Sequence, residues 1–333
     1  GTGPFKFGEW NHGSTVKLVR NDTYWDTGKP YLDGILFQVV PQGPNRSTGL
    51  ETGEIDFVLD FYLPKADVGR LSSNTSLISK RGQGAPAIDF MMMNLHQPLL
   101  ANKQVRQALA MALNRDTQVQ QAMGGLGRPG YGAFGDGFTW LLNPDVAYSK
   151  LYPVDAAKAK QLLTTANVPA DATLRLTYDA ARPNFVTGAQ IVKDNLRQVG
   201  ITVDLQPLER AVMIDKVFTQ KDFDLTLQSY FSSGDPSIGY HRLYLTNTGS
   251  APFVNASGYS NPQVDDLLAK ASTAPTQDER APLYKQAQAI LNDDLPAVIL
   301  YDEAGVDFAT KKLNELWTSI DSRNRWDVVW LSQ

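Results

Sequence analysis

The sequence predicts an α/β protein in which mixed sheets are flanked by helices. Strand and helix patterns alternate between residues 153 and 228, which favours right-handed crossovers and a mostly parallel sheet. The first 60 residues instead show short alternating apolar runs separated by turn residues, which is typical of β-strands. The 333 residues are enough for two domains, each with its own hydrophobic core.

The composition excludes several classes of protein. The net charge of −4 argues against a nucleic-acid-binding protein, which needs a basic surface patch. No run of about 18 apolar residues occurs, so the sequence predicts no membrane-spanning helix. The chain has no cysteine, which excludes disulfides, thiolate chemistry and a lipoprotein anchor within these 333 residues.

The elements of the first half follow from apolar periodicity. Alternating side chains predict strands near residues 5–10, 16–19 and 35–39, followed by a short helix over 45–52. The run IDFMMMNL at residues 88–95 indicates a buried strand. Asn102 then caps a helix with apolar residues at helical spacing, and the glycine-rich residues 124–137 form a loop.

The second half alternates strand and helix. Asp155 caps a helix that ends near Ala166, because Asp accepts hydrogen bonds from free backbone N–H groups. The same signals predict strands at 174–178, 201–205 and 223–228, and helices at 184–199, 209–219, 261–272 and 278–292. We expect a strand at 296–301 to leave this α/β lobe, and a last strand at 326–331 to pack on the first lobe.

Short motifs in a fixed order add a family resemblance. They include VRQAL at residues 105–109, ALNR at 112–115, VGITV at 199–203 and DFD at 222–224. With GTGPF at the start and LP at 295–296, they make the chain similar to the family 5 solute-binding proteins of ABC importers, the dipeptide- and oligopeptide-binding class. The resemblance covers nearly the whole chain. Each motif is weak by itself, and the specificity comes from their common order.

The resemblance implies the periplasmic-binding-protein type II-like fold, in the form found in large three-domain peptide-binding proteins. Residues 1–95 and 296–333 would form part of domain I, and residues 96–295 would form domain III. Domain II would be absent from this chain, because in the family the opening GTGPF segment follows a long earlier stretch of polypeptide. We therefore expect this chain to bind ligand weakly by itself.

The implied function is non-enzymatic. A family member captures a peptide or a similar small polar solute between its lobes and delivers it to the ABC permease in the membrane. The resemblance also implies a monomer without cofactor or metal, located in the periplasm or outside the cell, with a lipid anchor in a missing N-terminal segment as an open alternative. Two alternative functions stay open: the binding protein serves in sensing or chaperoning and not in import, or, more distantly, the chain is an α/β hydrolase.

Ligands of open α/β sheets bind outside the carboxyl ends of strands. Asp179 and Arg182 follow the predicted strand at 174–178. After the strand at 223–228 come aromatic rings, hydroxyls and a carboxylate within a few residues, a mixture that small-molecule pockets use. The candidate ligand contacts in this loop are Tyr230, Phe231, Ser232, Ser233 and Asp235.

The resemblance points to the same loop but also shows a departure. Many peptide-binding relatives carry a Trp followed closely by an Asp that pairs with the ammonium group of the peptide. In this sequence Ser229 or Tyr230 takes the Trp place, and Ser232 or Ser233 takes the Asp place. Two hypotheses stay open: Asp235 binds the ammonium from a shifted position, or the ligand is a non-peptide such as an oligosaccharide or an opine.

Four further residues are candidate ligand contacts. Phe138 and Trp140 follow the glycine-rich loop and would close over a ligand or plug the loop onto its domain. Arg242 would pair with Asp235 or with a ligand carboxylate. Asn94 is expected near the crossing between the lobes.

Other motifs do not support another function. Gly125, Gly127 and Gly130 match a dinucleotide-binding pattern, but they follow a predicted helix and not a strand. The three histidines lack the spacing of metal ligands, and no G-x-S-x-G nucleophile motif occurs.

Overall fold

A computed structural model describes most of the chain. The described residues are 1–41, 43–81, 87–318 and 325–332.

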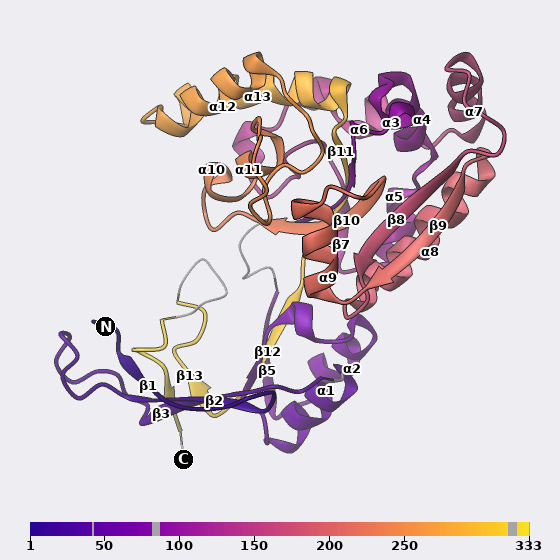
Figure 1. Cartoon of the computed structure of the whole chain (residues 1–333). Helices are drawn as coiled ribbons and strands as arrows, with labels where there is room; N and C mark the ends of the chain where they lie inside the picture. Colours follow the sequence, from indigo (N-terminus) through magenta and orange to yellow (C-terminus); the bar gives the residue numbers. More distant parts are fainter. Residues whose placement is uncertain (42, 82–86, 319–324, 333) are drawn as a thin grey trace. The chain divides into compact units, whose positions relative to one another are not determined.

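The chain forms two compact units, shown in Figure 1. Unit 1 consists of Gly1–Ala85 and Ala304–Gln333, and unit 2 consists of Pro86–Glu303. The chain therefore enters unit 2 once and leaves it once. No helix within the described ranges is long and apolar enough to cross a membrane.

Unit 2 is built on a six-stranded mixed sheet with the order β7-β11-β6-β10-β8-β9. The strands are β6 (Ala87–Met93), β7 (Gly127–Pro129), β8 (Thr173–Asp179), β9 (Thr202–Leu208), β10 (Leu225–Phe231) and β11 (Ala297–Glu303). β8 runs parallel to β9 and β10, whereas β6 runs antiparallel to β10 and β11. The carboxyl ends of β8, β10 and β11 and the start of β6 therefore lie at the same edge of the sheet.

Helices cover this sheet, and their starts follow the sequence signals. The longer helices are α4 (Lys103–Ala112), α7 (Ala156–Thr165), α8 (Pro183–Gln198), α12 (Pro262–Thr273) and α13 (Gln277–Asp294). Asn102 caps α4 and Asp155 caps α7, as predicted. Thr276 and Glu279 form a capping box at the start of α13, which satisfies N–H groups that lack helical partners. The shorter helices are α3 (Pro98–Ala101), α5 (Arg115–Thr117), α6 (Tyr148–Leu151), α9 (Arg210–Ile214), α10 (Pro236–Gly239) and α11 (His241–Tyr244), with π-helical turns at Gln118–Ala122 and Asp215–Thr219.

The core of unit 2 lies between the sheet and these helices. Phe90, Met91, Met92 and Met93 of β6 are fully buried on both faces of the sheet. α8 packs along β8 and β9, as Figure 1 shows, and buries residues at helical spacing such as Phe185.

Two predicted strands are placed differently from expectation. The strand predicted at 296–301 does not leave the α/β lobe, because β11 pairs with β6 and β7 inside the six-stranded sheet. The strand predicted at 88–95 is likewise a central strand of unit 2, and not part of the first lobe. Both strands are almost continuously buried, which requires cover on both faces. Unit 2 therefore begins before the predicted boundary at residue 96 and ends after the predicted boundary at residue 295. That unit 1 corresponds to domain I and unit 2 to domain III stays a prediction.

Unit 1 contains small antiparallel sheets. One has the order β1 (Phe5–Asn11), β2 (Thr15–Arg20), β3 (Gly34–Gln38), and the other has the order β4 (Phe57–Val58), β12 (Val306–Thr310), β5 (Leu77–Arg81). The remaining elements are α1 (Gly43–Thr52), α2 (Val68–Ser72), β13 (Leu313–Asn314) and β14 (Trp330–Leu331), with short helical turns at Asp60–Tyr62 and Lys65–Asp67. The returning chain thus supplies the central strand β12.

The predicted C-terminal strand is shorter than expected. β14 spans two residues and pairs with β13, while Trp326 lies in a turn and packs edge-on against Phe57 at 5.6 Å. Packing of the aromatic side chain therefore adds to strand pairing in attaching this segment to unit 1.

Candidate functional site

The edge of unit 2 where β8, β10 and β11 end gathers polar side chains on one face of the sheet. Asp89 of β6 lies directly opposite Ser229 of β10 and Tyr301 of β11. Directly opposed residues of antiparallel strands share a face, so these three side chains are neighbours. The start of α8 reaches the same face with Arg182 and Asn184.

Asn184 ties the buried members of this group together. Its side-chain amide donates to Asp89 Oδ2 at 2.9 Å and to the Tyr301 hydroxyl at 3.2 Å. Asp89 is 1% exposed, and its Oδ1 has no hydrogen-bond partner among the described residues. Burial, and then the charge of Asp89, raises the pKa of Tyr301 well above its ordinary value, so this phenol is neutral.

Arg182 supplies the positive charge of the edge. Its guanidinium lies 3.7 Å from the Glu303 carboxylate and 4.1 Å from the centre of the Phe185 ring. Burial alone would lower the pKa of Arg182, but the charges of Asp89 and Glu303 raise it overall. Ser229 Oγ also donates to Glu303 Oε1 at 3.4 Å. We call Asp89, Arg182, Asn184, Ser229, Tyr301 and Glu303 the polar edge.

Sequence reasoning missed most of the polar edge. Arg182 follows a predicted strand but is not among the predicted ligand contacts, and Asp89 lies inside the apolar run at 88–95. A charged residue within a buried strand is the signal that could have found it, because Asp is rarely buried without a specific reason.

The end of β10 and the loop after it contain both buried and accessible residues. Tyr230 is fully buried on the other face of the sheet, where it packs against Phe90 at 4.9 Å and beneath the Arg242 guanidinium at 4.3 Å. Ser232 is also fully buried, and its hydroxyl donates to the Asp235 carbonyl at 2.5 Å. Phe231 is 51% exposed, and Ser233 is partly exposed.

Asp235 is held by α13. Arg280 donates to both carboxylate oxygens, at 2.6 and 2.8 Å, and Asp235 also accepts from the Ser237 N–H at 2.8 Å. The hydrogen bonds from Arg280 hold the pKa of Asp235 well below its ordinary range. The expected pairing of Asp235 with Arg242 is therefore wrong: Arg242 donates to the Gly239 carbonyl at 3.0 Å. A ligand ammonium at Asp235 would have to compete with Arg280.

The remaining candidate ligand contacts, Phe138, Trp140 and Asn94, contact other residues of unit 2. Phe138 lies 6.0 Å from the Tyr240 ring, and Trp140 lies 5.5 Å from the Tyr284 ring. Both are partly exposed. Asn94 is buried and donates to the Lys221 and Phe223 carbonyls, at 3.1 and 2.8 Å.

The place of Asn94 corrects its expected position. Asn94 follows the last residue of β6, whereas the chain enters unit 2 directly before the first residue of that strand. Asn94 thus lies at the far end of β6 from the crossing, where it joins β6 to the loop before β10.

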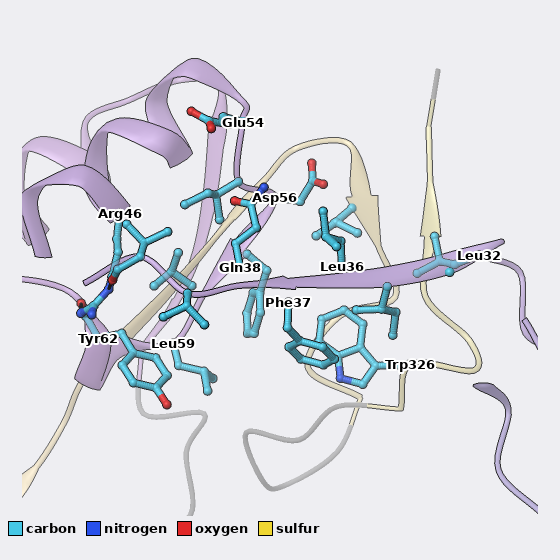
Figure 2. A pocket seen from close by; sticks show the side chains of 18 of the residues that line it. Leu32, Leu36, Phe37, Gln38, Arg46, Glu54, Asp56, Leu59, Tyr62 and Trp326 are labelled. Atoms are coloured by element: carbon cyan, nitrogen blue, oxygen red, sulfur yellow. Dashed lines mark hydrogen bonds between the residues drawn. The ribbon is translucent and has the colours of Figure 1, made fainter. Parts of the chain in front are cut away.

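Unit 1 contains an apolar hollow with a volume of about 910 Å³. β3 and the segment around β4 form its walls, and Leu36, Phe37 and Trp326 are among its lining side chains (Figure 2). Arg46 lies at its border and donates to the carbonyls of Val40, Pro41 and Tyr62. The lining is mainly apolar, and Arg46, Glu54 and Asp56 are its charged members. Within the described ranges, no group of three or more His, Asp or Glu side chains could hold a metal ion in either unit.

Comparison with known proteins gives a consistent picture. Residues 1–252 match the family model described as bacterial extracellular solute-binding proteins, family 5 Middle. The glutathione-binding protein GsiB of Pectobacterium atrosepticum is 29% identical over 332 residues, covering 97% of this chain and 62% of the relative. GsiB of Escherichia coli is 28% identical with the same coverage. The chain therefore spans about 62% of the length of these relatives.

Solved structures show the same fold. The periplasmic binding protein DppA from Helicobacter pylori, in complex with the peptide STSA, superposes with a TM-score of 0.87 at 26% identity, covering 100% of this chain and 63% of DppA. The binding protein AgaA in complex with agropinic acid gives a TM-score of 0.88 at 22% identity, covering 99% and 67%. The predicted α/β fold of the periplasmic-binding-protein type is thereby confirmed.

Proposed function

Because the chain belongs to the bacterial extracellular solute-binding proteins of family 5, we propose that it is part of an ABC-importer receptor that captures a small polar solute and delivers it to a membrane permease. Such a receptor binds its ligand without chemical turnover. In this proposal it works as a monomer, in the periplasm or outside the cell, with or without a lipid anchor. Unit 1 corresponds to part of domain I, and unit 2 corresponds to domain III.

The polar edge of unit 2 is the observation that carries the proposal. It brings one guanidinium, one incompletely bonded buried carboxylate and a neutral phenol to the carboxyl ends of the strands. Buried charges are costly, and perturbed titratable groups gather at functional sites more often than elsewhere. In our proposal Arg182 binds a ligand carboxylate, because its planar N–H groups match both carboxylate oxygens.

Asp89, Asn184 and Tyr301 act as positioning residues in this scheme. Asn184 follows Arg182 in the first turn of α8, and its hydrogen bonds to Asp89 and Tyr301 fix that turn to the sheet. Glu303 balances the charge of Arg182 until an anionic ligand arrives. Phe231 and Ser233 are accessible enough to touch the ligand, whereas Tyr230, Ser232 and Asp235 support the loop.

The ligand class that fits best is a peptide-like molecule with a free carboxylate. GsiB is a glutathione-binding protein and DppA holds a peptide, which supports a peptide as the first choice. An opine is the second choice, because AgaA binds agropinic acid and an opine also carries carboxylates. A neutral oligosaccharide would leave the charge of Arg182 without a partner from the ligand.

Calorimetry on the complete gene product tests this proposal. We expect glutathione, a tetrapeptide or agropinic acid to bind, and Arg182→Ala to weaken binding on the order of tenfold or more, because a buried charge pair is lost. Arg197→Ala is the matched control, since its side chain is 74% exposed and lies at the other end of α8. Binding of a neutral oligosaccharide alone, or unchanged affinity in Arg182→Ala, would refute the proposed role.

A further inference from the structure

A second buried carboxylate lies on the opposite face of the same sheet edge. Asp302 is next to last in β11 and is 2% exposed. It lies opposite Ile88 of β6 on one side and opposite Arg128 of β7 on the other. None of the ligand contacts proposed above involves its carboxyl group.

Asp302 fastens one end of a loop. Its Oδ1 accepts from the Asp136 N–H at 2.8 Å, while its Oδ2 has no partner among the described residues. The Asp136 carboxylate in turn accepts from Arg128 through both oxygens. The Tyr240 hydroxyl is also buried without a partner in the described ranges.

The backbone of the loop approaches Asp302 closely. Gly135 has φ +64°, and a Cβ atom there would lie 2.1 Å from Asp302 Oδ1. Only glycine fits such a contact. The start of the same loop is fixed independently, since Asn292 Oδ1 accepts from the Ala133 N–H at 2.8 Å. We call residues 132–138 the clamped segment.

The charges around Asp302 do not balance if every acid is ionised. Asp136 faces it from the clamped segment and Glu303 is its neighbour on β11, whereas Arg128 on β7 is the facing cation. Tyr240 faces it from the helical region after β10, and β6 contributes the apolar Ile88. Two close carboxylates that share one cation in a buried place do not both ionise readily.

We propose that Asp302 carries a proton at neutral pH, that this proton lets Asp302 and Asp136 lie together, and that its loss loosens the clamped segment. The protonated carboxyl avoids repulsion with Asp136 and gives its second oxygen a donor hydrogen. Ionised Asp302 would keep a charge in an apolar place beside a like charge.

The electrostatics support this assignment. Burial, and then the charge of Asp136, raises the pKa of Asp302 to about 8. When the segment opens, water reaches Asp302 and its pKa returns to about 4. A group whose pKa is raised in the closed state weakens closure as pH rises from the open value to the closed value. The clamp therefore weakens between about pH 4 and about pH 8, and is constant above that range.

The segment ends at Phe138, two residues before Trp140. If these aromatic residues touch the ligand, the clamp also makes ligand binding sensitive to pH. That consequence rests on the proposed function, whereas the clamp itself does not.

Hydrogen exchange of the complete gene product, measured by mass spectrometry on peptides that cover residues 131–141, tests the clamp without any ligand. After correction for intrinsic exchange, we expect protection to fall on the order of fiftyfold between about pH 6 and about pH 8, because the pKa of Asp302 is about 8 in the closed state and about 4 in the open state. Asp302→Asn keeps the acceptor for Asp136 and adds two donor hydrogens. It should hold protection constant over this range.

Asp307→Asn is the control, because Asp307 is also a buried carboxylate with a raised pKa but belongs to unit 1. It should leave the exchange of residues 131–141 unchanged.

Asp136→Asn is a second variant, in which Arg128 is free to stabilise ionised Asp302, so the fall in protection should move to lower pH. A pH-independent wild type, or the same fall in Asp302→Asn, would overturn the proposal. Failure of ligand binding with an intact clamp would count against the proposed function alone.

Discussion

Unit 2 buries its apolar side chains, whereas unit 1 displays many of them. Of the sixteen large hydrophobic residues that are exposed in the described ranges, eleven belong to unit 1, although it is the smaller unit. Trp25 is 74% exposed, Phe7 67% and Leu36 53%, while the strand Phe90–Met93 at the centre of unit 2 is completely buried. Exposed apolar surface of this extent marks an interaction face or a weak point of folding.

The difference follows from architecture. The sheet of unit 2 has helices against it and a single large core cluster. Unit 1 has two three-stranded sheets and short helices, and among its described residues fewer apolar side chains are buried, such as those of Leu71, Phe308 and Ala309. Small sheets bury little surface per residue, so unit 1 gains less stability from its own side chains.

The largest test of this contrast compares two phenylalanines. Phe90→Ala should lower the free energy of unfolding of unit 2 by about 3 to 5 kcal/mol, because a fully buried ring leaves a cavity. Phe37→Ala in unit 1 removes a ring that is 49% exposed, and should cost less than about 1 kcal/mol. Denaturant titration with a probe in each unit measures both values. Equal losses would show that unit 1 is as well packed as unit 2.

Ion pairs should show the same contrast on a smaller scale. Arg280→Ala should destabilise unit 2 by about 2 to 3 kcal/mol, because Arg280 is mostly buried and holds Asp235 by two hydrogen bonds. Arg70→Ala in unit 1 removes a side chain that is 48% exposed, so the loss of stability should be much smaller than that of Arg280→Ala. Because the pKa of Asp235 is lowered on folding, the stability contributed by the Arg280 pair is present above about pH 4 and is lost as pH falls below it.

The stability of the two units should also depend differently on rising pH. Burial raises the pKa of Asp307 in unit 1 to about 6, against about 8 for Asp302 in unit 2. Both pKa values lie above the unfolded value, so each group lowers stability as pH rises from about 4 to its own folded pKa. Hydrogen exchange resolved by unit should show the loss levelling off near pH 6 in unit 1 and near pH 8 in unit 2. Identical profiles would remove this distinction.

The smallest effect concerns the apolar hollow of unit 1. Leu36→Lys should change the free energy of unfolding by no more than about 0.5 kcal/mol, because the side chain is already exposed. It should reduce the fluorescence of a bound apolar dye, since it places a charge in the hollow. Val212→Lys, at a residue 53% exposed in unit 2, is the control and should leave the dye signal unchanged. An unaltered signal in Leu36→Lys would mean that the dye binds elsewhere.

Local patterns predicted many of the elements, and long-range pairing explains the errors. Asn102 and Asp155 cap their helices as expected, because capping involves residues only two or three positions apart. Both β6 and β11 are predicted as strands, but the structure places them in unit 2 and not in the first lobe. An apolar run indicates burial, yet it does not tell which sheet provides the neighbours.

The candidate site shows the same limit. Tyr230 and Ser232 have the chemistry of ligand contacts, but the strand turns Tyr230 into the core and the loop buries Ser232. The partner of Asp235 is Arg280, which lies 45 positions later on α13 and not in the neighbouring loop. Asp89 and Arg182 come close only because β6 and the start of α8 meet at one edge.

By itself, the sequence determined the α/β class, the order of most elements, several helix starts and a resemblance to family 5, because these depend on periodicity and on short motifs. The tertiary structure alone decided which polar residues are buried together, which are already paired, and that the pKa of Asp235 is lowered whereas the pKa of Asp302 is raised. The physical reason is that burial and charge balance depend on neighbours in space, and the fold brings those neighbours from distant parts of the chain.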